Sequence, residues 1–245
     1  MSHPEFFDRV PGIKLIDPLA RFLGASGDGV LEYRYVDAVK LAGHSCPTVA
    51  SAYWLTCKAL AALYGTALPE RGAIRVSFQQ DRANGVTGVI ANVVSMLTGA
   101  AGDGGFKGIG GRFDRRDLLE FNAQIPLQMR FTRTDDGTSA DVAAHLSHVP
   151  ADPEQAGLLQ RWVAGQSTAE ETRRFGVLWQ ERVRRILIDH ADNPAVFEIR
   201  LIKSHPGHED AAAFSSPPCY AGEFPGYFGE TQDIHIVGPD TYRKP

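Results

Sequence analysis

Two strand-like runs joined by a tight turn constrain the fold of this chain more than any other feature of its sequence. Residues 123–134 and 139–149 each alternate apolar and polar side chains, as half-buried strands do. Between them lies Asp135-Asp136-Gly137, and an Asp-Gly pair favours the tight turn of an antiparallel hairpin. The hairpin therefore argues against a doubly wound, wholly parallel sheet.

Helical and strand-like periodicities recur along the rest of the chain. Apolar residues at helical spacing predict helices over 47–64, 86–98, 153–162 and 168–189. Shorter alternating or apolar runs predict further strands over 33–39, 71–80, 197–203 and 234–237. Hairpins together with blocks of helices predict an α+β fold, in which an antiparallel or mixed sheet packs with helices in a single domain over residues 1–203.

Residues 204–245 differ in composition and are interpreted as an irregular C-terminal extension. The stretch 204–229 is rich in Pro, Gly and Ser, which predicts a long surface tail or lid with little regular structure. It nevertheless carries several aromatic rings: Phe214, Tyr220, Phe224, Tyr227 and Phe228. We expect these rings to pack onto the domain or onto a partner subunit and to cover a cleft near Cys46.

Composition excludes several functional classes. The net charge is −4 and no basic stripe interleaved with aromatics is present, so nucleic acid is not an expected partner. No apolar run approaches the roughly 18 residues of a membrane span, and the N-terminus does not read as a secretory signal. Three widely spaced cysteines do not make a disulfide framework. We therefore expect a cytoplasmic protein with no membrane association.

The segment Gly43-His44-Ser45-Cys46-Pro47 places a thiol and an imidazole two residues apart at a predicted helix start. Pro suits the first position of a helix, so Cys46 falls at or beside the N-cap, where the helix dipole favours a thiolate. Such a pair is a soft metal-ligand pair or the start of a Cys/His nucleophilic site. It is equally compatible with a buried N-cap cysteine beside a loop histidine.

This segment, followed by a helix rich in small residues, resembles the Gly-His-x-Cys-Pro signature of the FmdE family, which is named after a component of formylmethanofuran dehydrogenase. Later landmarks of that family agree in order, namely a strand over 74–80, the helix end 96–99, the glycine-rich stretch 104–108 and the segment 194–199. The likeness covers residues 36–202. Thr48 stands where the family usually has Gly, and the family's further cysteines and acid fall at 89–92 and 100–101, where this chain has none. Only His44 and Cys46 carry over residue by residue.

The resemblance implies a homodimer with a cleft near the subunit interface. We expect His44 and Cys46 to bind a transition metal or a metal-containing cofactor in that cleft, zinc in the first place and iron or haem as alternatives, with a redox or accessory role. One competing interpretation is a metal-free enzyme with Cys46 as nucleophile and His44 as its base. Another is a binding module for a small anionic ligand.

Other residues are candidates for completing such a site. Asp81 follows a predicted strand, and His205 and His208 have a spacing able to chelate a metal. Lys107 and Arg112, in the glycine-rich stretch 99–112, would hold an anionic ligand, or that stretch is simply a tight turn into an extended segment. Two other histidines are not predicted to share a metal, because they stand on opposite faces of a predicted strand: His145 and His148. His148 is expected to be a satisfied core or interface histidine. Cys219 is the one cysteine of the tail, which excludes a four-ligand zinc site built from the tail alone.

Overall fold

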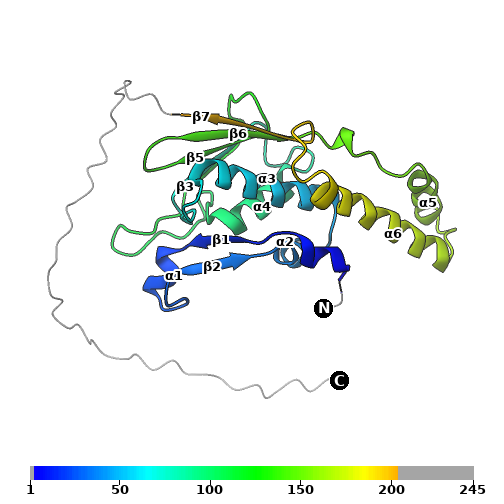
Figure 1. The fold of residues 1–245 in the computed structure, drawn as a ribbon, viewed down its shortest axis with the longest axis horizontal. Coiled ribbons are helices and arrows are strands. Elements are labelled where there is room, and N and C mark those ends of the chain that lie inside the picture. The colour runs from blue at the N-terminus through cyan, green and yellow to red at the C-terminus, as the bar shows by residue number, and fades with distance from the viewer. Residues whose placement is uncertain (1–2, 204–245) are drawn as a thin grey trace, which may run out of the picture. The chain divides into compact units, whose positions relative to one another are not determined.

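A five-stranded mixed sheet forms one layer of the structure, a computed structural model that describes residues 3–203 (Figure 1). Its strands, in spatial order, are β4 (Leu119–Glu120), β3 (Ile74–Phe78), β5 (Met129–Arg133), β6 (Ser139–Ala144) and β7 (Phe197–Ile202). β3 and β4 run parallel, and every other pair in the sheet is antiparallel. The mixed sheet with its helices confirms the α+β class.

The predicted hairpin is present as β5 and β6. Arg133 N–H donates to the Thr138 carbonyl at 2.9 Å, and Gly137 takes a left-handed φ of 72° that a glycine adopts without strain. Both strands are shorter than their alternating patterns. β5 begins only at Met129, after Pro126, whose nitrogen cannot donate to a ladder.

β6 ends at Ala144, and the chain then turns into a short 3₁₀ helix, η2 (Leu146–His148). The predicted strand over 139–149 is therefore wrong beyond Ala144, and so is a core position for His148, whereas an interface position stays a prediction. Its side chain is exposed, because the last strand pairing of β6 is that of Ala144 with Phe197. The alternation of apolar and polar residues continues past Ala144, although β6 has no partner strand there.

The central layer consists of two helices that lie against the sheet, α3 (Pro47–Tyr64) and α4 (Thr87–Thr98) (Figure 1). α3 is buried on nearly every side, which explains its content of alanine and other small residues. Both helices confirm the predicted periodicities. α3 also ends where predicted, at Gly65 with φ 58°.

A third layer covers the opposite side of these helices. It contains η1 (Glu5–Arg9), the antiparallel hairpin β1 (Ile13–Ile16) and β2 (Val30–Tyr33), α1 (Pro18–Phe22) and α2 (Tyr35–Ala42). The predicted strand over 33–39 is thus wrong beyond Tyr33. Arg34 N–H donates to the Asp37 carboxylate at 2.9 Å, as in a capping box, and this hydrogen bond starts α2.

The two C-terminal helices confirm their predictions and form an arm at one end of the domain (Figure 1). α5 (Glu154–Val163) packs against α6 (Ala169–Arg184), which continues as a π-helical segment, η3 (Arg185–Asp189). A capping box between Thr168 and Glu171 begins α6. Among the described residues, no helix is long and apolar enough to cross a bilayer.

A buried ionic cluster connects the start of α1 with the end of α4. The Asp17 carboxylate accepts hydrogen bonds from the first turn of α1, at Leu19 and Ala20, and pairs with the guanidinium groups of Arg71 and Arg115. Arg71 also donates to two carbonyls at the end of α4. The cluster therefore holds α1 and α4 together across the domain.

Candidate functional site

The Gly-His-x-Cys-Pro segment forms the junction between α2 and α3. Gly43 ends α2 with a left-handed φ of 75°, and Cys46 is the N-cap of α3, as predicted. The Val49 N–H donates to the Cys46 sulfur at 3.4 Å. The Cys46 side chain thus caps the first turn of α3.

His44 lies on the surface of this junction with one ring nitrogen engaged. Its Nδ1 is 2.9 Å from the Ala42 carbonyl oxygen. Because a carbonyl oxygen can only accept, Nδ1 is the donor in this hydrogen bond, and in the neutral imidazole the lone pair is then on Nε2. Metal-binding histidines are commonly oriented by this kind of hydrogen bond.

Ser45, between the two candidate ligands, is held by a helix more than a hundred residues later in the chain. Its carbonyl accepts hydrogen bonds from Trp179 Nε1 at 3.0 Å and Gln180 Nε2 at 3.2 Å. Its hydroxyl lies 3.0 Å from Gln180 Oε1 and 2.8 Å from the Tyr35 hydroxyl. Burial raises the pKa of Tyr35, which therefore stays protonated. α6 thus fixes the backbone from which His44 and Cys46 project.

The two candidate ligands differ in exposure. His44 is exposed, whereas Cys46 is 8% exposed and belongs to the hydrophobic core cluster. In residues 3–203, no three histidine, cysteine, aspartate or glutamate side chains lie close enough together to hold a metal ion. The described part of the chain therefore supplies two donors and does not bring Asp81 to them.

Asp81 serves a different purpose in the described structure. Its carboxylate accepts from the Ala83 N–H at 2.8 Å and from Asn122 Nδ2 at 3.0 Å, and these hydrogen bonds lower its pKa. The contacts attach the loop before α4 to the segment that follows β4. Asp81 also lines an open hollow of about 530 Å³ that includes Arg82 and Asn92.

The glycine-rich stretch contains the tight turn that its sequence allowed. Ile109 and Arg112 exchange two backbone hydrogen bonds of 2.8 and 3.0 Å around Gly110 and Gly111, both with left-handed φ. This is the geometry of a type I′ hairpin turn. Lys107 and Arg112 are exposed, and the Arg112 guanidinium lies 5.6 Å from the centre of the Phe113 ring. Among residues 3–203, neither Lys107 nor Arg112 forms an ion pair.

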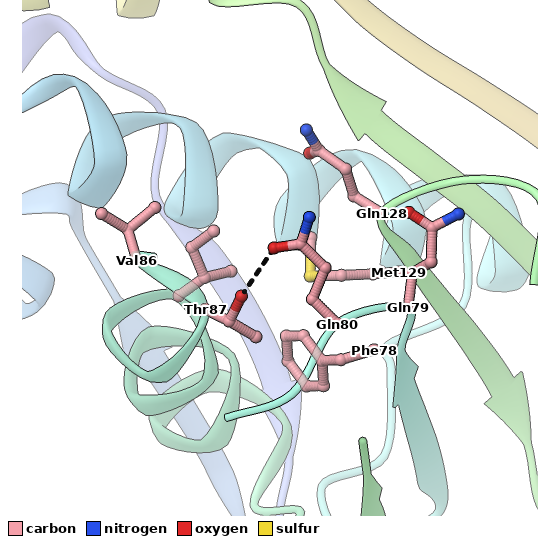
Figure 2. A pocket seen from close by; sticks show the side chains of 8 residues that line it. Phe78, Gln79, Gln80, Val86, Thr87, Gln128 and Met129 are labelled. Carbon is pink, nitrogen blue, oxygen red and sulfur yellow. Dashed lines mark hydrogen bonds between the residues drawn. The ribbon is translucent and has the colours of Figure 1, made fainter. Parts of the chain in front are cut away.

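A small cavity of about 110 Å³ lies where β3 ends and α4 and β5 begin (Figure 2). Three glutamine side chains project around it: Gln79, Gln80 and Gln128. Gln80 Oε1 accepts from the Thr87 hydroxyl at 3.4 Å. Gln128 is held by both backbone groups of Ala144, at 3.0 and 3.3 Å. Because no ionisable side chain lines this cavity, it offers neither acid-base groups nor anionic metal ligands.

Cys57, in the middle of α3, is expected to remain unreactive in the folded protein. Burial raises the pKa of its thiol to about 12, so roughly one part in 10⁴ is thiolate at pH 8. In a Cys219→Ser background, thiol labelling at that pH should modify Cys46 and leave Cys57 unmodified until denaturant is added. Equal labelling rates for the two thiols would contradict this expectation.

Several sequence predictions lie outside the described residues. They concern His205 and His208 as additional ligands, the lone Cys219, the short strand over 234–237 and the aromatic lid. The sequence does not reveal the partners of Ser45 on α6, because nothing local distinguishes Trp179 and Gln180 from other helix residues. A comparison with models of known protein families finds no match, and neither does a search of curated proteins.

Proposed function

We propose that the chain binds a soft transition metal or a metal-containing cofactor through His44 and Cys46, with zinc as the first candidate and iron or haem as alternatives. The observation that carries the proposal is the hydrogen bond from His44 Nδ1 to the Ala42 carbonyl. It leaves Nε2 available as a ligand in a fixed orientation. The Val49 N–H fixes the position of the Cys46 sulfur, which as a thiolate is a soft ligand for a transition metal.

The same geometry favours a metal pair over a nucleophile with its base. A histidine that activates a cysteine must reach the thiol with a ring nitrogen. Within the described residues, the His44 ring bonds to a backbone carbonyl and the Cys46 sulfur to a backbone amide, and the two side chains are not hydrogen-bonded to each other. Each side chain is thus held by a backbone group and not by the other side chain.

Two protein donors leave coordination positions to be filled, since zinc usually takes four ligands. A bound cofactor, an open position for a substrate, or His205 and His208 of the C-terminal extension would supply them. A homodimer, with the site near the subunit interface of a cytoplasmic protein, completes the proposal. The proposal includes a redox or accessory role; a redox role would require iron or haem, because zinc has no redox chemistry.

Replacing His44 by Ala should lower zinc occupancy at least as much as replacing both His205 and His208 by Ala. A donor on a turn that is already fixed by hydrogen bonds loses less conformational entropy on binding than donors in a stretch whose Pro- and Gly-rich sequence predicts little regular structure. Native mass spectrometry of the full chain, purified without a histidine tag, measures occupancy in each variant. The exposed His145→Ala is a matched control that should keep full occupancy. Unchanged occupancy in His44→Ala would place the site elsewhere.

A further inference from the structure

A second hollow, separate from the His44 segment, lies between α4 and the glycine-rich stretch. It has a volume of about 250 Å³ and adjoins the open hollow beside Asp81, because Arg82 and Asn92 line both. One wall is apolar and includes Ala91, Leu119 and Phe121. The opposite wall is backbone of residues 101–105.

Two glycines in this wall are not required by the fold. Gly102 and Gly104 have no left-handed φ, and a Cβ on either would meet no other atom within 4 Å. Gly99 and Gly108 differ, since both have left-handed φ and a Cβ there would lie 2.1 Å from the Arg115 side chain or 2.3 Å from the Arg112 carbonyl oxygen. The absence of side chains at 102 and 104 therefore leaves open space beside two residues that line the hollow.

Several hydrogen-bond donors of the residues that line this space have no protein partner among residues 3–203. In the described part of the chain, the Arg82 guanidinium forms no ion pair and the Asn92 amide no hydrogen bond, although both line the hollow. The backbone N–H groups of Gly102 and Asp103 likewise donate to no acceptor among residues 3–203. A guanidinium with nearby amides recognises a carboxylate or a phosphate.

The surrounding charges decide between these two anions. Asp103 lines the hollow and Asp81 lines the one beside it, so two carboxylates stand near the single guanidinium of Arg82. A dianionic phosphate would be repelled more strongly by those groups than a singly charged ion. The apolar wall with Phe121 in turn suits an organic body over an inorganic one.

We propose that the hollow between α4 and residues 101–105 is a binding site for a small organic monocarboxylate, with Arg82 holding the carboxylate and Phe121 and Leu119 contacting the apolar body. Asn92 and the free backbone amides add further donors. The ligand occupies the space that Gly102 and Gly104 leave open. The site does not depend on the metal proposed at Cys46.

Benzoate is a suitable probe, and calorimetric titration of the full chain after treatment with a chelator measures its affinity. Arg82→Gln should weaken benzoate binding about tenfold or more, as loss of a charge-assisted hydrogen bond does. Gly104→Val should weaken it by a similar factor by filling the hollow. Gly27→Val is the matched control, because Gly27 also lacks left-handed φ and has open space around it, yet lines none of the hollows described.

Benzamide and inorganic phosphate complete the experiment. Neutral benzamide and phosphate should each bind more weakly than benzoate to the unsubstituted protein. Benzoate binding that is unaffected by Arg82→Gln, or no tighter than that of benzamide, would overturn the proposal. Tighter binding of phosphate would overturn the choice of a monocarboxylate. Because the protein is free of metal throughout, none of these results depends on whether His44 and Cys46 bind one.

Discussion

Replacing Asp17 by Asn is expected to destabilise the protein by about 3–5 kcal/mol, the usual effect of removing one partner from a buried ion pair. The side chains of Asp17, Arg71 and Arg115 are only 4%, 14% and 8% exposed. Asn keeps the shape and one acceptor oxygen of Asp but removes the charge. Two guanidinium groups would then stay buried without a carboxylate, and water could not solvate them.

Urea unfolding at neutral pH measures this loss, with Asp8→Asn as a control because Asp8 is on the surface. The pH dependence provides a second test. Burial alone would raise the pKa of Asp17, but the Ala20 N–H and the two arginines outweigh it and lower the pKa. The contribution to stability is therefore present above the unfolded pKa of about 3.9 and is lost as the pH falls through the lower folded pKa. An Asp17→Asn protein with the same unfolding midpoint as the unsubstituted protein would contradict this account.

Features that depend on neighbouring residues were predictable from the sequence. The turn at Asp135-Asp136-Gly137 and the helix that begins at Pro47 carry their signals within a few residues. Turn residues, a cap and hydrophobic periodicity were sufficient for both. The class of fold followed from them, because a hairpin beside long helices excludes a uniformly parallel sheet.

Features that depend on distant partners were not predictable. Asp17 pairs with arginines that are 54 and 98 positions away, and the sequence alone does not indicate which charges meet. Strand ends fail for the same reason, since His148 continues an alternating pattern after β6 has lost its partner. The segment 33–39 was predicted as a strand because so short a run does not distinguish helical from strand periodicity. In the structure, the hydrogen bond between Arg34 and Asp37 marks the start of a helix there.

The candidate site shows the same division. The N-cap position of Cys46 could be predicted, because Pro47 marks a helix start. The hydrogen bond of His44 and the anchoring of Ser45 by α6 could not be predicted, since both are visible only in the folded structure. The hollow lined by Arg82 could not be predicted either. The glycine-rich sequence predicted Lys107 and Arg112 as anion-binding residues, and both are exposed at or near a tight turn.

Titration of the metal-free protein with Co²⁺ tests the central proposal most directly, because a thiolate bound to cobalt gives an intense charge-transfer absorption. The unsubstituted protein should develop this band at one equivalent of metal. The double variant Cys57→Ser, Cys219→Ser removes the other two cysteines, so that Cys46 is the one that remains, and it should keep the band in full. Cys46→Ser should lose it completely, since a hydroxyl does not replace a thiolate as a soft ligand. An unchanged band in Cys46→Ser, or no band in the unsubstituted protein, would contradict the account.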